Sequence, residues 1–492
     1  MAIGRVGFGV GAAVAEDDGR PQATWPAAGA GTSRRLWAQP RWDPYWLAAA
    51  LFLAYAALSL ARYRRMMTLS WDLGIFEQAI RGYAHLHAPI ADIKGPGTNI
   101  LGDHFSPIIA LIAPFYRLFP TPVTLLVAQA ALFAFAAVPV TRVAARLLGR
   151  GQGVAIGIAY GLSWGVQRAV EFDFHEIAFA MPLLALSLEA ILRGRWWTAL
   201  AWAFPLVLVK EDMGLTTAAI AFVVALRARN DPSRGRVVPC AIALAVFGVL
   251  ATVLALTVII PAFNTGGDYG YWQKLTGHGV SGSRHVPPGI AVRTVLWILV
   301  PTSGLYALRS PLLLVAVPTI GWRLAAKDDH YWGLDWHYSA VLMPVALLAL
   351  VDAIARDRAR TGMPRRLRAY AARLPAAVAV AALALTTTLP LGALLHWGAY
   401  RVDARTIAVK KLLRRIPDGA TVESDTTPIS RLTRRTTVYW IGDAKGIAPD
   451  YITFSLRPLG RGDPLGYARA LHPGATYDEV ARAGGHILLR RD

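Results

Sequence analysis

The sequence predicts an all-α polytopic membrane protein of about eleven transmembrane helices, followed by a small α/β domain. Apolar residues make up 55% of the chain and charged residues only 17%, whereas soluble domains carry about 25% charged residues. The mean hydropathy is +0.39, and apolar runs of the kind that cross a bilayer recur from Tyr45 onward. Only the last segment, residues 399–492, loses this character.

The N-terminal segment 1–40 is rich in Gly, Ala and Pro and mostly lacks the apolar period of a helix. A signal peptide would have to use the mildly apolar stretch from Val6 to Ala15, which is short and interrupted by glycines. We therefore expect a disordered cytoplasmic tail over 1–40 and a transmembrane domain over 41–398.

The transmembrane domain is predicted from apolar runs separated by short polar loops. These runs are 45–62, 122–141, 152–169, 177–192, 196–210, 213–228, 238–261, 291–308, 311–324, 338–355 and 375–396. Several are shorter than the ~20 residues that a perpendicular crossing needs, so their boundaries are approximate.

The formal net charge of +20 is typical of nucleic-acid-binding proteins, but here the basic residues lie in short loops between apolar runs. That arrangement is the positive-inside pattern of membrane proteins, so we exclude nucleic acid as a partner and expect membrane lipid instead. The single cysteine, Cys240, excludes an intramolecular disulfide.

The orientation follows from the loops after the second, fourth, sixth and tenth runs, which share one face. They contain Arg142, Arg146, Arg150, Arg193, Arg195, Arg227, Arg229, Arg234, Arg236 and seven arginines between Arg356 and Arg373. We expect this face and the N-terminus to be cytoplasmic, and the domain 399–492 to be extracytoplasmic. Arg62, Arg64 and Arg65 fall at the outer end of the first run, where they either snorkel or serve an anionic ligand.

The first external segment, 63–121, contains a predicted helix that lies in the membrane interface. Leu73, Phe76, Ile80 and Tyr83 recur there at helical spacing. Asp72 opens this helix, and its carboxylate has two interpretations: an N-cap that accepts from the first free amides, or a functional group held at the membrane surface.

Two further clusters fall in external loops near this helix. Asp103 and His104 precede a helix that begins near Pro107, and a solvated loop is the alternative interpretation. Asp173, His175 and Glu176 stand at the mouth of a span, where a carboxylate and an imidazole so close together can bind a divalent cation or a phosphate.

Two more clusters lie at later span mouths on the same face. Lys210, Glu211 and Asp212 meet between two apolar runs with almost no loop. We expect them either to pair with one another or to line a watery cavity. His337 and Tyr338, together with His330 and Asp335, stand among several aromatic residues. An aromatic belt explains the rings but not two histidines and an aspartate.

The C-terminal segment combines short β-rich runs with helical stretches. Strands are predicted at 421–423, 437–440, 451–454 and 486–489, and helices at 401–415, 464–472 and 477–483. Neither a G-x-G-x-x-G sequence nor a P-loop is present, so a nucleotide site is not supported.

Five motifs occur in the order that a known family shows: 72–78 (DLGIFEQ), 103–107 (DHFSP), 172–175 (FDFH), 209–212 (VKED) and 337–338 (HY). They resemble a family of uncharacterised bacterial multi-pass membrane proteins, described as predicted membrane proteins. That family is similar to the GT-C glycosyltransferase superfamily. The resemblance covers about residues 45–355 and implies a location in the bacterial cytoplasmic membrane.

The resemblance implies a GT-C-like fold and a sugar donor linked to polyprenyl phosphate, with an extracytoplasmic glycan, lipid or protein as acceptor. Asp72 matches the acidic residue that GT-C enzymes need after the first span, and it would be the general base. Lys210, His175, His337 and Arg64, in that order, would assist the departing phosphate. A divalent cation shared by Asp103 and Asp173 is a further option. The paired acidic motif of several GT-C families is absent, since Leu73 and Gly74 follow Asp72.

The residues alone leave two other functions open. One is a transporter or flippase for a lipid-linked or anionic substrate, although the chain shows no repeated halves of the kind that transporters often have. The other is a non-catalytic membrane scaffold whose C-terminal domain binds cell-envelope material.

Overall fold

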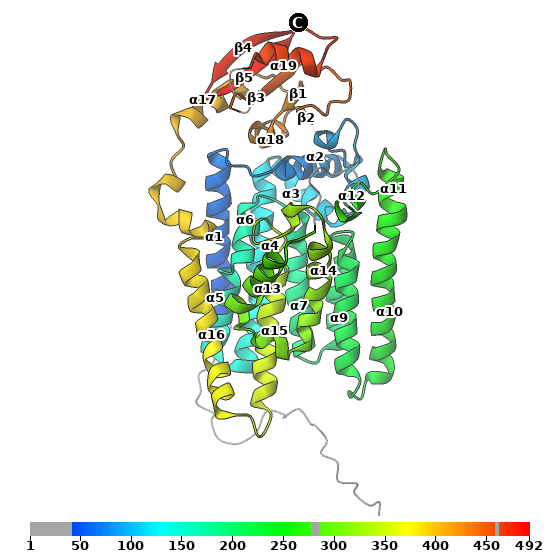
Figure 1. The fold of residues 1–492 in the computed structure, drawn as a ribbon, viewed down its shortest axis with the longest axis vertical. Coiled ribbons are helices and arrows are strands. Elements are labelled where there is room, and N and C mark those ends of the chain that lie inside the picture. Colours follow the sequence, from blue (N-terminus) through cyan, green and yellow to red (C-terminus); the bar gives the residue numbers. More distant parts are fainter. Residues whose placement is uncertain (1–41, 277–284, 458–461) are drawn as a thin grey trace, which may run out of the picture. The chain divides into compact units, whose positions relative to one another are not determined.

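The computed structural model describes residues 42–276, 285–457 and 462–492, so the predicted tail over 1–40 lies outside the described residues. A bundle of helices runs roughly parallel to its long axis, and a five-stranded sheet lies at one end (Figure 1). Among the described residues, four helices are long and apolar enough to cross a membrane: α1 (Asp43–Arg64), α4 (Pro122–Leu148), the continuous stretch Arg234–Phe263, and α16 (Arg365–Thr386). The stretch Arg234–Phe263 joins α10 (Arg234–Leu254) to α11 (Ile260–Phe263) through one π-helical turn.

The other apolar passes are shorter or broken, so the number of crossings stays a prediction. The third predicted span is split into α5 (Arg150–Gly161) and α6 (Trp164–Glu171). Three further spans combine 3₁₀ and α turns: η4 (Glu176–Phe179) with α7 (Ala180–Leu192), α8 (Trp196–Ala203) with η5 (Phe204–Leu208), and η8 (Pro311–Ala316) with α14 (Val317–Ala325). A proline near the start of η5, η8 and α14 removes a backbone donor and favours such breaks.

The remaining passes of the bundle are unbroken. They are α9 (Met213–Ala228), α13 (Pro288–Ser303) and α15 (Leu342–Arg358). α15 is buried along most of its length, as expected for a helix that is apolar on all sides. Turns η7 (Tyr306–Arg309) and η9 (Asp329–Tyr331), and α12 (Trp272–Thr276), connect these passes.

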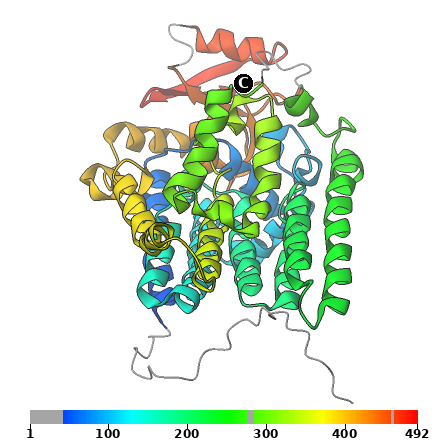
Figure 2. The ribbon, with the colours of Figure 1, turned by 60° about the horizontal axis from the view of Figure 1, so that its bottom comes forward.

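The two ends of the bundle differ in charge. At one end Arg150 pairs with Asp43 at 2.6 Å, and Arg358 donates to the Leu148 carbonyl, so arginine-rich loops gather there. We call this the basic end. At the other end, which we call the sheet end, the hydroxyl of Tyr63 donates to the Ser430 carbonyl of the C-terminal domain. Figure 2 shows the helical bundle and the C-terminal sheet from a second direction.

The chain between α1 and α4 lies at the sheet end. It comprises α2 (Asp72–Ala84), η1 (Asp92–Lys94), η2 (Ile100–Gly102), η3 (Pro107–Ile112) and α3 (Ala113–Leu118). The polar face of α2 is buried too, because the C-terminal domain covers it. Gln78 donates to the Val438 carbonyl, and Arg81 donates to the Thr433 carbonyl at 2.6 Å.

The C-terminal domain follows η10 (Pro390–Leu395) and η11 (Trp397–Ala399). Its helices are α17 (Ala404–Leu413), α18 (Thr426–Leu432) and α19 (Pro464–Leu471). Its strands are β1 (Thr421–Ser424), β2 (Thr437–Trp440), β3 (Tyr451–Ser455), β4 (Tyr477–Ala483) and β5 (His486–Arg491). The strand order is β2-β1-β3-β5-β4, in which β1 pairs parallel with β2 and β3.

One predicted element of this domain is wrong: residues 477–483 form strand β4, not a helix. Gly484 and Gly485 both adopt positive φ, which lets the chain reverse tightly and pair β4 antiparallel with β5. Pairing with β5 decides the conformation of this segment.

Candidate functional site

Asp72 is the first residue of α2, and its side chain is half-buried. The Ser70 hydroxyl donates to Asp72 Oδ2 at 3.0 Å and accepts from the Asp72 amide at 3.1 Å. No side-chain cap closes the helix, so the N-cap interpretation of Asp72 is wrong. The Ser70 hydroxyl therefore holds one oxygen of the Asp72 carboxylate, and the free amides of α2 do not donate to this carboxylate.

The surroundings of Asp72 come from three segments. Trp71, the residue before it, packs edge-on against Trp440 of β2 with ring centroids 4.4 Å apart. The ammonium of Lys94 lies 5.8 Å from the Trp71 ring and 3.2 Å from Asp103 Oδ1. The start of α2 therefore meets both η1 and the C-terminal sheet.

A first polar group connects Asp103 with the loop before α9. His104 Nδ1 lies 3.2 Å from Glu211 Oε1, and its Nε2 lies 3.7 Å from Asp103 Oδ2. The hydroxyl of Tyr269 donates to the same Glu211 oxygen at 3.1 Å. Burial opposes a charged His104, but the carboxylates of Asp103 and Glu211 outweigh it and raise the pKa of this imidazole.

A second polar group lies at the start of η4. Glu176 is fully buried, with His175 Nδ1 2.8 Å from one carboxylate oxygen and Lys210 Nζ 3.0 Å from the other. The His175 ring stacks on the His337 ring at 3.6 Å. The two basic neighbours compensate the charge of this buried carboxylate.

A small cavity of about 20 Å³ opens between the second group and α14, which is room for about one water molecule. Its polar lining consists of His175, Lys210, Asp212, His337 and Tyr338. One carboxylate oxygen of Asp212 is buried without a hydrogen bond. Lys210 pairs with Glu176 and Glu211 with His104, so these charges pair with other segments and not with one another, whereas Lys210 and Asp212 also line this cavity.

Asp173 stands between the two groups in the connection from α6 to η4. Its φ of +75° is unusual for a non-glycine residue, and Gln129 of α4 holds this backbone by donating to the Asp173 carbonyl and accepting from the His175 amide. Burial raises the pKa of the Asp173 carboxyl to about 7, and the negative charge of Asp72 adds to the shift. The two carboxylates are therefore electrostatic neighbours.

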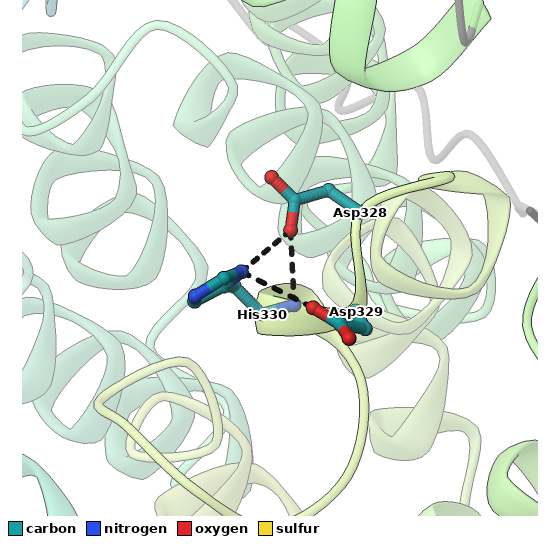
Figure 3. Close-up of side chains that lie close together, drawn as sticks. All are labelled: Asp328, Asp329 and His330. Carbon is teal, nitrogen blue, oxygen red and sulfur yellow. Dashed lines mark hydrogen bonds and ion pairs between the residues drawn. The ribbon is translucent and has the colours of Figure 1, made fainter. Parts of the chain in front are cut away.

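The two predicted cation ligands have separate partners. Asp103 contacts Lys94 and His104, whereas Asp173 Oδ2 accepts from the Leu69 amide at 3.2 Å. Within the described residues, one group of at least three acidic or histidine side chains has ligand atoms within 4.8 Å of one another: Asp328, Asp329 and His330 (Figure 3). In Figure 3 both carboxylates point at the same imidazole nitrogen, and Asp329 and His330 are largely exposed, which is the arrangement of a solvated turn.

Several important side chains were not predicted as site residues. Lys94 and Tyr269 complete the first group, Gln129 holds the Asp173 backbone, and Arg323 donates to the Tyr331 and Gly333 carbonyls and to the Ser339 hydroxyl. Gln129 and Arg323 each gave a signal, because they are polar residues inside an apolar run, whereas Lys94 and Tyr269 lie outside the runs and gave none. Asp335 and Arg64 are exposed and stand outside both groups.

The fold and this end of the bundle define a multi-pass membrane protein with a GT-C-like architecture. The chain belongs to the family described as predicted membrane protein (DUF2079), whose model matches residues 62–452. The crystal structure of ArnT from Cupriavidus metallidurans bound to undecaprenyl phosphate is similar, with a TM-score of 0.55 and 15% identity over 90% of this chain and 97% of that chain.

The apo structure of the same ArnT gives a TM-score of 0.52 and 14% identity over the same shares of the two chains. At such identities the similarity shows the fold alone. No protein of curated function matches the chain by sequence.

Proposed function

We propose that this protein transfers a sugar from a polyprenyl-phosphate donor to an extracytoplasmic acceptor. The observation that carries the proposal is the fold, which follows that of ArnT in complex with undecaprenyl phosphate along nearly its whole length. The half-buried Asp72 carboxylate at the sheet end supports it, because Asp72 lies close enough to Asp173 to raise the pKa of that carboxyl, and Lys94 lies beside the neighbouring Trp71.

In this proposal Asp72 is the general base. An acceptor hydroxyl oxygen attacks the anomeric carbon of the donor, the bond from that carbon to the phosphate oxygen breaks, and the phosphate leaves with the electron pair. Asp72 takes the hydroxyl proton. The single hydrogen bond from Ser70 orients the carboxylate and leaves its other oxygen available.

The departing phosphate needs cationic help, and the contacts favour Lys94 over Lys210 for that role. Lys210 pairs with the fully buried Glu176, whereas Lys94 pairs with the partly exposed Asp103 and lies beside Trp71, next to Asp72. Lys274 is a second candidate, since its ammonium stands 4.9 Å from the Tyr271 ring and 5.4 Å from the Tyr331 ring. His175, His337 and Tyr338 would shape the site rather than contact the phosphate.

The test uses the full chain purified in detergent with a short-chain polyprenyl-phosphate sugar and measures release of polyprenyl phosphate. Asp72→Asn should lower turnover at least about 100-fold, the lower range for loss of a general base, while polyprenyl phosphate still raises Tm as in the wild type. Asp268→Asn is the matched control, because Asp268 is an exposed carboxylate on a loop at the same end.

Lys94→Ala should weaken the Tm shift that polyprenyl phosphate causes, and Lys94→Arg should restore most of it. Unchanged turnover in Asp72→Asn would remove Asp72 as the base. A wild-type chain that is folded but neither binds polyprenyl phosphate nor releases it would overturn the proposal and favour a scaffold or a transporter.

A further inference from the structure

A cationic pocket lies at the sheet end, away from both polar groups of the candidate site. It encloses about 390 Å³ between the outer ends of α1 and α4 and the helices α17 and α18. The residues that line it are Tyr63, Thr121, Pro122, Lys410, Leu413, Arg414, Asp418, Ser430, Arg431, Arg434 and Arg435. Five of these side chains are cationic and one is anionic.

Most of this positive charge has no acidic partner. The one carboxylate, Asp418, pairs with Arg435 at 3.0 Å. Within the part of the chain that the structure describes, Lys410, Arg414, Arg431 and Arg434 form no ion pair. Lys410 and Arg431 instead donate to the main-chain carbonyls of Arg64 and Tyr63. The pocket therefore carries about four uncompensated positive charges, counted from these contacts.

The cations are held close together. The Arg431 guanidinium lies 3.6 Å from the centre of the Tyr63 ring, and its Nε is buried without a hydrogen-bond partner. Burial lowers the pKa of Lys410, and the positive charges of Arg431, Arg414 and Arg64 lower it further. Like charges gathered around a hollow favour an anionic ligand, which relieves their repulsion.

One edge of the pocket adjoins an apolar surface. Leu111, Phe115, Leu118 and Phe119 have 63%, 63%, 72% and 66% of their surface exposed. Their spacing of four, three and one residues puts them largely on one side of the η3–α3 segment, and the Thr121 amide of the pocket donates to the Phe119 carbonyl. Such a row of large apolar side chains at the end of transmembrane helices fits lipid acyl chains.

We propose that this pocket binds the phosphate of an anionic membrane lipid, with the acyl chains along the apolar row. The headgroup phosphate would contact Arg414, Arg431 and Arg434 together and offset part of their positive charge, as anionic lipids do at basic clusters beside transmembrane helices. Because the pocket joins α1 and α4 to α17 and α18, the lipid would also fasten the C-terminal domain to the membrane. None of the residues assigned to sugar transfer lines this pocket.

The test measures Tm shifts of the full chain in detergent with dioctanoyl phosphatidylglycerol, dioctanoyl phosphatidylcholine or inorganic phosphate. The variant is Arg414→Gln with Arg434→Gln, because both side chains are exposed and make no ion pair within the described residues. The control is Lys411→Gln with Arg490→Gln, which removes the same charge from exposed sites outside the pocket.

Phosphatidylglycerol should stabilise the wild type and the control alike, and its apparent Kd should be about 30-fold weaker for the pocket variant. This figure follows from about 1 kcal/mol for each basic residue at a membrane surface. Phosphatidylcholine should have little effect. Equal responses of the pocket variant and the control would overturn the proposal. Inorganic phosphate as effective as phosphatidylglycerol would overturn the lipid assignment and indicate a site for soluble anions.

Discussion

The carboxyl group of Glu77 is buried where α2 meets α18. The Tyr116 hydroxyl donates to it at 2.9 Å, and the Thr433 hydroxyl donates to its other oxygen. Burial raises the pKa of Glu77 from 4.5 to about 7, although these hydrogen bonds and the charge of Arg81 oppose the shift. Because the buried Glu77 carboxyl needs its proton near neutral pH, the contact between α2 and α18 is sensitive to pH.

Proton linkage gives the direction in which the stability of the folded chain changes with pH. The folded chain binds the Glu77 proton more tightly than the unfolded chain, so the stabilisation is complete below about pH 4.5 and is lost as pH rises through about 7. Glu77→Gln should remove this loss, which is of the order of 3 kcal/mol. Unfolding measured from pH 5 to pH 8 for both chains tests this: the stability difference between variant and wild type should grow with pH. A constant difference would contradict the raised pKa.

The ion pair of Glu176 and Lys210 gives a second prediction at this scale. Lys210→Met leaves a buried carboxylate that retains only His175, and such losses cost about 3–5 kcal/mol. Glu176→Gln together with Lys210→Met should recover much of that cost, because no buried charge remains unpaired. The free energies of unfolding of the two single variants and the double variant give the coupling energy between Glu176 and Lys210. Additive effects would show that the ion pair contributes little to stability.

At the scale of elements, α2 and α18 approach so closely that only glycine fits at position 74. A Cβ on Gly74 would lie 2.3 Å from Ile429 Cγ2 and 2.9 Å from Ile93 Cδ1. Gly74→Ala should therefore loosen the C-terminal domain and speed its removal by protease. Adding Ile429→Ala, which deletes the contacting methyl group, should restore part of the resistance. Equal cleavage of the wild type and Gly74→Ala would contradict the tight contact.

Most helices could be predicted from the sequence, but many contacts between them could not. Apolar runs predicted most helices, and the polar clusters at span mouths predicted segments that carry polar groups, because both signals are local. The β4 strand was missed although its pairing with β5 is local too: Gly484 and Gly485 before β5 are a hairpin signal, and the interpretation of 477–483 as a helix passed over it. By contrast, nothing in the sequence pairs Lys94 with Asp103 or places Gln129 behind Asp173, since those contacts arise only when separate segments pack.

At the scale of the whole molecule, we predict that the basic end and the sheet end lie on opposite sides of the membrane. Cys240→Ala gives a cysteine-free background. Arg360→Cys at the basic end and Asp478→Cys on β4 are then exposed reporters. In intact cells a membrane-impermeant thiol reagent should label the second and spare the first until the membrane is broken. The reverse pattern would invert the predicted orientation and place Asp72 in the cytoplasm.

The hydrogen bonds from Gln78 and Arg81 to the C-terminal domain have a consequence for biogenesis. The helix that begins with Asp72 emerges early in synthesis, yet its partners Val438 and Thr433 are made more than 350 residues later. The polar face of α2 must therefore stay hydrated until nearly the whole chain has been made. Maturation of this protein should accordingly be limited by docking of its last segment, so that ribosome-bound chains contain the helices of the bundle but an incomplete α2 environment.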